Sequence, residues 1–553
     1  MNLEELRPEI KKYALQNAVQ FEGKANPGAV IGKLLGKDPS LKSQMKDVSM
    51  VVQEIIKEVI SLSVDEQKEQ LAQIDPSLLE KKKKEKREFQ VPDLKNTENL
   101  VMRFAPNPNG PMSFGHARQA LINWWFVEKY NGQFILRLDD TDPKTKVPLN
   151  EAYEWIPQDL EWLGIKANQV IKQSERFDIY YDYAKQLIQK EKAYIDTQDP
   201  EEMRVWLRKG QASPDRDLPV QTQLERWEKM LNGQFKDGQA ILRMKTDLEA
   251  KNPAVRDWPM ARIITDGSHP IKEARVWPLL NFCSAIDDHE FKVTHIVRGV
   301  DLMVSDERQK YLYDVFGWTY PQTIYTGKLI LNGVKSTSQS RIAIENGEYE
   351  GWDDIRLGTL RALKRRGYTP QSIQEFMKSV GTNKNNVEVS LENLTAFNKD
   401  TIDETSNRHF FVKDPVQIII EGAPEQEITM DLHPKSGKGG RTIKTSNQFK
   451  ITKEDFESIK EGELFRLIDC LNARKVGDKF IYVSTELEDY KKEGKHILHW
   501  VTQGDEIQIL MPDASIVTGI LEANTIKTND IVQFERFGFC RSDSENKFWF
   551  THK

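Results

Sequence analysis

Residues 101–118, VMRFAPNPNGPMSFGHAR, hold a strand, a turn and the start of a helix in one short stretch. Val101 to Phe104 alternate in character as a strand does, and the prolines and glycine that follow predict a turn. After the turn, Ser113 is the predicted N-cap of a helix whose apolar side chains recur at helical spacing. Because the first N–H groups of such a helix attract anions, the stretch predicts a cradle for a nucleotide phosphate.

Two residues at the start of this helix are suited to contact a phosphate. Gly115 lets a phosphate approach the backbone, and His116 can add a hydrogen-bond donor. An ordinary strand-turn-helix connection, with His116 on the surface, explains this stretch equally well when it is taken alone. Residues 133–138 predict a second strand that ends in a cluster of carboxylates beginning at Asp139. Open α/β sheets bind ligands at the carboxyl ends of their strands, which favours the nucleotide site.

Length, charge and cysteine content limit the class of protein. A chain of 553 residues is too long for one hydrophobic core, so several domains are expected. The formal net charge of -6 does not indicate nucleic-acid binding, but such binding depends on local basic surface. Three widely spaced cysteines fit a reducing compartment and argue against a structural zinc site: Cys283, Cys470 and Cys540. Because the sequence shows neither an apolar leader nor a run long enough to span a bilayer, we expect a cytoplasmic protein without a membrane partner.

Several segments, in the same order along the chain, resemble class I glutamyl-tRNA synthetases of the archaeal type, which are related to glutaminyl-tRNA synthetases. They are RFAPNPNGPMSFGHAR, FILRLDDTDP, DLEWLGI, AILRMKTDLEAKNPAVRDWPMARI, RVWPLLNFCSAIDDHEFKVTHIVRG, NRHFFVKDPV and KHILHWV. Together they cover roughly residues 98–553, and several ordered matches are far more specific than one motif.

The resemblance implies a multidomain α/β protein. Its expected parts are an N-terminal helical domain and basic linker at 1–90, a doubly wound Rossmann-like catalytic domain with halves at 98–200 and 276–340, an acceptor-end-binding insertion at 201–275, a helical connector at 341–395, and β-barrel anticodon-binding domains at 396–553. The N-terminal domain could help to hold RNA or could serve only for docking. Local rules add two helix caps, Ser305 before an acidic first turn and Thr369 before Pro370.

The activity implied by the resemblance is ATP-dependent ligation of L-glutamate to its transfer RNA through a glutamyl-adenylate, with release of AMP and pyrophosphate. Because the attacking carboxylate is already ionised, catalysis needs positioning and charge neutralisation rather than a protein nucleophile. ATP is expected to carry Mg²⁺, so no metal ligands are predicted in the chain. The expected catalytic residues are Ser113, Gly115, His116, Lys335, Ser336 and Ser338, and Asp301 and Thr337 complete the expected ATP site.

Two motifs depart from the family pattern. The HIGH motif corresponds to residues 113–116, so its first histidine is a serine here. The KMSKS loop falls at residues 334–338, VKSTS, with neither lysine in register. These departures keep open a second class of function, a catalytically silent tRNA-binding paralogue.

Choosing glutamate over glutamine is an electrostatic problem, because the two side chains differ chiefly in charge. Burying a carboxylate is costly without a cation, and the guanidinium fork of arginine binds it bidentately. Arg103 on the first strand and Arg298 at the end of THIVR are placed for this role, although either alone could form a surface ion pair. Arg298 stands where glutaminyl enzymes usually lack arginine, which disfavours the glutaminyl-tRNA synthetase alternative. By the resemblance, Asp139 takes the α-ammonium group, and the rest of the pocket is lined by Ala105, Asn107 and Ser284.

Two stretches are candidate RNA contacts. Arg256 and Trp258 in RDW could position the RNA terminus, although Trp258 could equally be a core residue. Lys438, Arg441 and Lys444 lie in GKGGRTIKTSNQFK and could meet phosphates, unless this is only a solvated loop. The expected partners are glutamate, ATP and the glutamate transfer RNA, and the glutamine transfer RNA stays open as a second one.

Overall fold

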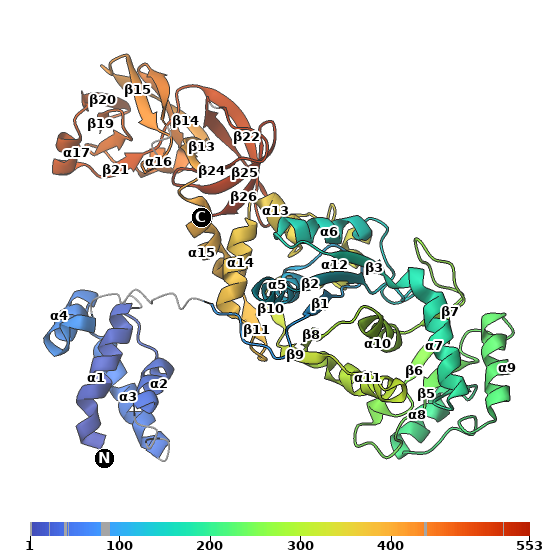
Figure 1. Cartoon of the computed structure of the whole chain (residues 1–553). Coiled ribbons are helices and arrows are strands. Elements are labelled where there is room, and N and C mark those ends of the chain that lie inside the picture. The colour runs from blue at the N-terminus through green and yellow to red at the C-terminus, as the bar shows by residue number, and fades with distance from the viewer. Residues whose placement is uncertain are drawn as a thin grey trace. The chain divides into compact units, whose positions relative to one another are not determined.

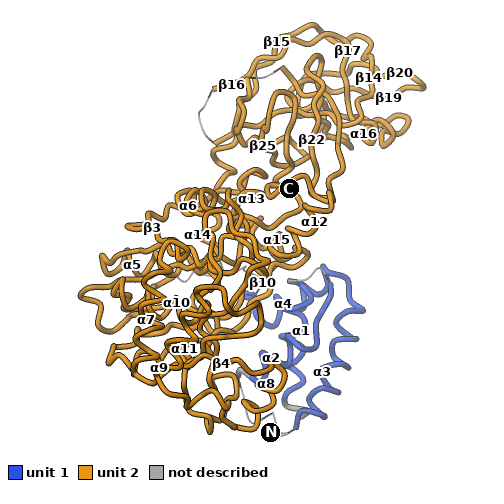
Figure 2. The backbone as a smooth tube through the Cα atoms, turned by 90° about the vertical axis from the view of Figure 1, so that its right-hand side faces the viewer, with its two compact units in different colours: residues 1–88 blue, residues 89–553 orange. Residues whose placement is uncertain are grey.

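The computed structural model describes residues 3–20, 23–37, 41, 44–78, 89–435, 439–523 and 525–553. It divides into two compact units, residues 1–88 and 89–553 (Figure 2). The basic linker expected within residues 1–90 corresponds to KKKKEKR at 81–87, which lies outside the described residues. Among the described helices, none combines the length and the apolar character that a bilayer span requires.

The first unit is built from helices, as its periodicity predicts. They are α1 (Leu3–Gln20), α2 (Pro27–Lys37), α3 (Met45–Ile60), α4 (Val64–Ile74) and the 3-10 turn η2 (Pro76–Leu78). Their apolar faces share one core that includes Ile10, Val52 and Ile55. Ser63 and Glu66 cap α4 reciprocally, each accepting a backbone N–H from the other.

The second unit is organised around a five-stranded parallel sheet with the order β3-β2-β1-β8-β9 (Figure 1). Its strands are β1 (Val101–Phe104), β2 (Gln133–Leu138), β3 (Gln169–Lys172), β8 (His295–Gly299) and β9 (Gln322–Thr326). The chain leaves β1 toward β2 on one side and returns to β8 on the other, so the strand order reverses between β1 and β8. Ligands bind at such a reversal, beyond the carboxyl ends of the strands. The Rossmann-like fold predicted for the catalytic domain is confirmed.

The two faces of β1 meet different neighbours. Met102 and Phe104 pack in a large apolar core with side chains of α5 (Phe114–Tyr130). Val101 points to the other face and packs with Ile135. Arg103 alternates with Met102 and Phe104 and so shares the face of Val101. The remaining helical elements around the sheet are α6 (Ala152–Trp162), η3 (Gln173–Arg176), α7 (Phe177–Gln189), α10 (Leu280–Glu290), η5 (Val300–Leu302) and α11 (Met303–Phe316).

One predicted cap in this region is wrong. Ser305 was expected to begin the helix, but α11 starts at Met303 and its N-cap is Leu302, which makes no side-chain cap bond. The reason is that η5 runs directly into α11, so the first turn is already helical before Ser305 is reached.

A four-stranded antiparallel sheet, β4-β5-β6-β7, forms the insertion between the halves of the parallel sheet. Its elements are β4 (Ala193–Asp196), α8 (Pro200–Lys209), α9 (Val220–Leu231), β5 (Ile241–Met244), η4 (Pro253–Val255), β6 (Pro259–Ile263) and β7 (Val276–Pro278). Three buried tryptophans contribute to its core: Trp227, Trp258 and Trp277.

A largely helical segment follows the parallel sheet. It contains β10 (Leu329–Leu331), α12 (Thr337–Glu345), α13 (Leu360–Arg366), α14 (Pro370–Val380), β11 (Val387–Val389) and α15 (Leu391–Ile402). Thr369 caps α14 by accepting the backbone N–H of Ser372, and Pro370 is the first helical residue, as predicted.

The rest of the chain, where β-barrel domains are expected, forms β-sheets with mixed parallel and antiparallel pairing. A seven-stranded sheet has the order β12-β24-β25-β26-β22-β23-β13, and a six-stranded sheet has the order β17-β14-β20-β19-β18-β21. The elements are β12 (Asn407–His409), β13 (Phe411–Lys413), β14 (Pro415–Glu421), β15 (Gln426–Asp431), β16 (Gly440–Thr445), β17 (Gln448–Thr452), α16 (Lys453–Ser458), β18 (Leu464–Leu467), β19 (Asn472–Val476), β20 (Lys479–Ser484), α17 (Leu487–Glu493), β21 (His496–Leu498), β22 (Gly504–Leu510), β23 (Ile516–Glu522), β24 (Ile531–Phe534), β25 (Gly538–Ser544) and β26 (Lys547–His552).

Candidate active site

The turn after β1 leads into α5, whose N-terminus is closed by a reciprocal cap between two residues. Ser113 is the N-cap of α5, as predicted, and its Oγ accepts the backbone N–H of His116 at 3.4 Å. In return, the backbone N–H of Ser113 donates to His116 Nδ1 at 3.3 Å. The N–H of Gly115 lies in the first turn and has no acceptor within the helix. The hydroxyl proton of Ser113 is not used in the cap, so both groups can donate to an anion.

The His116 side chain is neutral at physiological pH. Burial, helped by the charge of Lys146, lowers the pKa of the imidazole to about 4. Because Nδ1 accepts the N–H of Ser113, the ring proton belongs on Nε2. The cap therefore selects the tautomer that leaves Nε2–H available as a donor.

The second predicted ATP loop also runs into a capped helix. Ser336 is the N-cap of α12 and forms a reciprocal box with Gln339, so Thr337 and Ser338 occupy the first turn of the helix. The ammonium group of Lys335 lies 2.8 Å from a Glu348 carboxylate oxygen. A phosphate must therefore compete with Glu348 for this cation.

The two loops lie against each other, although more than 200 positions separate them in the sequence. A Cβ atom on Gly110 would come within 3.0 Å of the Thr337 side chain and 2.9 Å of the ring of Trp352. This contact leaves no room for a side chain at residue 110 and holds the turn after β1 beside the start of α12. The backbone N–H of Phe114 donates to Gly358 at 2.9 Å and closes the same junction.

Asp301 is exposed on η5, after the end of β8. Its carboxylate lies 3.2 Å from the ammonium group of Lys328. The carbonyl of the next residue, Leu329, would be 3.5 Å from a Cβ on Gly115. The chain at Lys328 and Leu329 therefore runs close to the start of α5. Asp301 is therefore linked through Lys328 to the chain that runs beside Gly115 at the start of α5.

The structure buries both predicted glutamate-binding arginines and gives each an acidic partner. Arg103 Nε donates to Asp288 at 3.1 Å, and the Arg103 side chain is 8% exposed. Arg298 forms an ion pair with Asp306 and donates to Gln309 at 3.1 Å. Neither is the surface ion pair considered above. Burial would raise the pKa of Asp288, but the charges of Arg103 and Arg137, with a smaller contribution from Arg298, lower it.

Asp139 and Asn107 connect the segments that follow the carboxyl ends of β2 and β1. Asp139 accepts a hydrogen bond from Arg137 Nε at 2.7 Å, and Asn107 Nδ2 donates to the Asp139 carbonyl at 2.8 Å. Burial raises the pKa of the Asp139 carboxyl, although Arg137 opposes the rise. Ala105 is half-buried just beyond β1, and Ser284 is 3% exposed on α10.

Four residues that contact the predicted pocket residues escaped the sequence analysis, and so did Asp287, which lies 3.9 Å from one of those four, Arg137. The other three are Asp288, Asp306 and Gln309. Arg137, Asp287 and Asp288 carried a usable signal, because an arginine within FILRL and a double aspartate within SAIDDHE place charges in apolar segments. A buried charge needs a partner, so each of these charged residues predicts a neighbouring residue of opposite charge.

Both candidate RNA residues of the insertion are engaged within the protein, Trp258 by burial and Arg256 by hydrogen bonds. Trp258 is 1% exposed and belongs to the core, which is the alternative position considered for it, so its ring is not available to stack on a base. The Arg256 guanidinium donates to the backbone carbonyls of Leu207, Arg208 and Ala250. Arg256 therefore holds the turns of the insertion together in this conformation.

The candidate contacts in the β-sheet region differ in exposure. Arg441 lies 2.5 Å from the buried carboxylate of Glu522, and the arginine side chain is 10% exposed, so its charge is already neutralised within the protein. Lys444 is exposed on β16 and can reach a phosphate. Lys438 lies outside the described residues.

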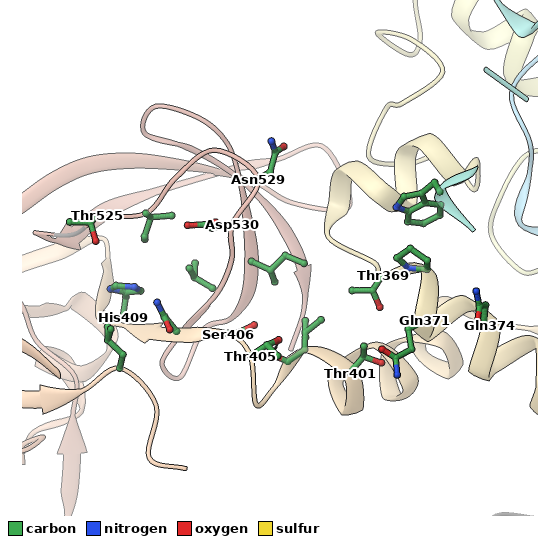
Figure 3. A pocket seen from close by; sticks show the side chains of 18 of the residues that line it. Thr369, Gln371, Gln374, Thr401, Thr405, Ser406, His409, Thr525, Asn529 and Asp530 are labelled. Atoms are coloured by element: carbon green, nitrogen blue, oxygen red, sulfur yellow. Dashed lines mark hydrogen bonds between the residues drawn. The ribbon is translucent and has the colours of Figure 1, made fainter. Parts of the chain in front are cut away.

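A cavity of about 870 Å³ opens between the helical segment and the β-sheet region (Figure 3). Thr369 and Gln374 line it from α14 and its cap, and Asn529 and Asp530 line it from the loop before β24. None of the predicted site residues that the structure describes lines this cavity. It is therefore separate from the residues described above that are predicted to bind ATP and glutamate.

Asp159 holds the backbone just before the N-cap of α5, and its buried carboxyl makes the stability of the protein depend on pH. Its carboxylate accepts the backbone N–H of Met112 at 2.9 Å, and burial raises its pKa to about 7. The pKa of Asp159 is higher in the folded than in the unfolded chain, so ionisation of this carboxyl lowers the free energy of unfolding. The loss begins as pH rises above about 4 and is complete above pH 7.

Asp159→Asn should therefore have a higher free energy of unfolding than the unmodified protein. The difference between the two proteins should be about 2 kcal/mol larger at pH 8 than at pH 5.5. The amide oxygen can still accept the Met112 N–H, whereas Asp159→Ala loses the acceptor and should be less stable at both pH values. Scanning calorimetry at the two pH values measures the difference. A pH-independent difference between Asp159→Asn and the unmodified protein would show that the carboxyl is not titrating in this range.

Comparison with known proteins shows the family to which the chain belongs. Residues 99–404 match the family model of the catalytic domain of class I tRNA synthetases (E and Q), and residues 406–485 match the model of their anti-codon binding domain. The glutamate–tRNA ligase of Pyrococcus furiosus is 46% identical over 550 residues, which covers 96% of each chain. Those of Thermococcus kodakarensis and Archaeoglobus fulgidus are 45% and 43% identical and cover at least 97% of each chain.

A solved glutamate tRNA ligase from Elizabethkingia meningosepticum, in complex with its amino acid, matches 56% of this chain and 71% of its own at 22% identity and a TM-score of 0.42. The full-length relatives confirm the resemblance that the motifs predict. On the strength of its catalytic-domain match and these relatives, the chain belongs to the family of class I tRNA synthetases for glutamate and glutamine.

Proposed function

We propose that this protein joins L-glutamate to its transfer RNA in an ATP-dependent reaction that passes through a glutamyl-adenylate. The observation that carries the proposal is a pair of buried guanidinium groups, Arg103 on β1 and Arg298 on β8, on the two strands between which the strand order reverses. Two buried cations at this position suit a substrate with an acidic side chain. Relatives of nearly equal length are glutamate–tRNA ligases, which supports the same activity.

In the first step, the α-carboxylate of glutamate attacks the α-phosphorus of ATP and pyrophosphate leaves. The Gly115 N–H, the Ser113 hydroxyl and His116 Nε2–H are the proposed donors to the phosphates. The Lys335 ammonium group would leave Glu348 and bind the departing pyrophosphate. The hydroxyls and first-turn N–H groups at the start of α12 would assist it. Mg²⁺ would arrive with ATP and neutralise part of its charge. Asp301 is the proposed partner of the ATP ribose.

The glutamate substrate would lie between the two arginines and Asp139. A guanidinium has five N–H donors, and Arg103 uses two of them on Asp288, so others remain for the side-chain carboxylate of the substrate. The α-ammonium group would meet Asp139. Asn107 Oδ1 can accept from the same ammonium group, since it is buried and accepts no hydrogen bond from the described residues.

In the second step, a hydroxyl of the terminal ribose of the transfer RNA attacks the activated carbonyl and releases AMP. By family likeness, this is the 2′-hydroxyl. Lys444 and the N-terminal helical unit are the candidate RNA contacts that stay accessible for test. Because all substrates of this reaction occur in the cytoplasm, we propose that location for the protein.

Charging assays with purified transfer RNAs test the proposal directly. The full-length protein, given ATP, Mg²⁺ and labelled glutamate, should charge the glutamate transfer RNA, and labelled glutamine should give only background. Charging with glutamine would identify a glutaminyl enzyme, and RNA binding without either product would identify a silent paralogue. The same assay with the glutamine transfer RNA decides whether that RNA is a second substrate.

A further inference from the structure

We propose that Asp288 and Arg137 are positioning residues that form a buried link between the two ends of the amino-acid pocket and so set the length of the side chain it accepts. The inference deepens the proposed function and rests on it. Neither residue needs to touch the substrate. Each acts by holding a residue that is proposed to do so.

The link is a continuous series of hydrogen bonds between alternating charges. Arg103 donates to Asp288 Oδ1 at 3.1 Å and to Oδ2 at 3.4 Å. Asp288 Oδ1 also accepts from an Arg137 terminal nitrogen at 2.7 Å. Arg137 in turn donates to Asp139 through Nε at 2.7 Å and through its other terminal nitrogen at 3.4 Å. Arg103, the proposed side-chain binder, is thus connected to Asp139, the proposed ammonium binder.

Burial makes this series stiff. The side chains of Arg103, Asp288, Arg137 and Asp139 are 8%, 1%, 2% and 9% exposed. Burial alone would raise the pKa of Asp288, but Arg103 and Arg137 outweigh it and the pKa of the carboxyl is lowered, so Asp288 stays ionised. Breaking one member would leave its neighbour as a buried charge without a full partner, which is strongly unfavourable.

Asp288 lies on α10, whereas the residues it connects lie on or just beyond β1 and β2. Arg103 and Arg137 are on neighbouring parallel strands, and Arg103 is paired in register with Ile135. A carboxylate from a third element therefore bridges the two arginines and counters the repulsion between their charges. The guanidinium of Arg103 is held at one distance from Asp139.

A fixed distance between the two recognition groups favours one substrate length. Aspartate is one methylene shorter than glutamate, so its side-chain carboxylate cannot meet Arg103 while its ammonium group meets Asp139. Loosening the link should let Arg103 move, which weakens glutamate binding and lowers the preference for glutamate over aspartate. Displacements of about 1 Å in a reacting complex change rates by about 100-fold.

Asp287 is a matched control beside Asp288 on α10. It is also fully buried, but its hydrogen bonds come from Gln173, Tyr180 and Arg176. Its nearest approach to Arg137 is 3.9 Å. Asp287→Asn therefore disturbs an equally buried carboxylate without breaking a hydrogen bond of the link.

The test compares Asp288→Asn and Asp287→Asn in the full-length protein with transfer RNA present. Adenylate formation gives kcat and KM for glutamate, aspartate and ATP, and thermal unfolding reports the fold. Asp288→Asn should raise KM for glutamate by about tenfold or more, change KM for ATP by less than about threefold, and lower the glutamate-to-aspartate preference. Asp287→Asn should lower Tm and leave KM for glutamate within about threefold of the unmodified protein.

Two further variants keep the test decisive if an asparagine variant does not fold. Asp288→Glu keeps the charge but moves the carboxylate by one methylene, and it should also lower the glutamate-to-aspartate preference. Tyr180→Phe, which removes one hydrogen bond to Asp287, replaces Asp287→Asn as the control. Equal effects of the link and control variants, or an unchanged preference in folded Asp288 variants, would overturn the inference. An unmodified protein that forms no glutamyl-adenylate would instead overturn the proposed function.

Discussion

Replacing Arg298 with cysteine should lower kcat/KM for glutamate in adenylate formation by at least about 30-fold, which corresponds to about 2 kcal/mol. The substitution removes one of the two cations proposed to meet the substrate carboxylate. Among the described residues, it also leaves the buried Asp306 carboxylate with the hydroxyls of Tyr320 and Tyr325 as its side-chain hydrogen-bond donors. The site then holds an excess of negative charge, which opposes an acidic substrate more than a neutral one. Steady-state ATP–pyrophosphate exchange with transfer RNA present measures the loss.

Arg243→Cys is the matched control for this experiment. Arg243 is also largely buried and pairs with a buried carboxylate, Asp196, at 2.7 Å, but it lies in the insertion. We expect Arg243→Cys to lower Tm and to leave kcat/KM for glutamate close to that of the unmodified protein. An Arg298→Cys variant with the same kcat/KM as the unmodified protein would remove the main ground for glutamate selection.

Replacing His116 with alanine should slow adenylate formation about 100-fold, the usual cost of removing one preorganised donor. The Nε2–H donor is lost, and so is the acceptor that Nδ1 offers to the Ser113 N–H. The helix keeps its second cap bond, from the His116 N–H to Ser113 Oγ, so the fold should survive. Single-turnover adenylate formation separates this effect from changes in RNA binding.

His116→Gln separates the cap from the donor. Glutamine at this helix position preserves the reciprocal cap, and its amide can still donate toward the phosphates. We expect an activity between those of the unmodified protein and His116→Ala, with a Tm close to that of the unmodified protein. If His116→Ala and the unmodified protein form adenylate equally fast, the histidine is not a phosphate donor.

The parts of the site that depend on neighbouring residues in the chain could be predicted from the sequence. The bounds of β1 and β2 and the N-cap at Ser113 follow from alternation, turn residues and capping chemistry, all of which act over a few positions. Ser305 shows the limit of these rules, because an adjoining 3-10 turn began the helix earlier. The prediction of the parallel sheet rested on the order of the motifs as well as on local pattern, and the structure confirms it.

The partners of the charged residues could not be predicted, because tertiary packing brings them together. Asp288, which accepts from Arg103, lies 185 positions further along the chain. Glu522, which neutralises Arg441, comes from a different strand of the β-sheet region. A charge in the sequence therefore indicates that a partner is needed, but only the fold decides whether that partner is a substrate, RNA or another side chain.

The most direct test of the account compares kcat/KM for glutamate and glutamine with the unmodified full-length protein, ATP and transfer RNA. The account predicts a preference for glutamate of at least about 100-fold, because two buried guanidinium groups are better partners for a carboxylate than for a neutral amide. Equal values, or a higher value for glutamine, would contradict the claim that Arg103 and Arg298 select the substrate.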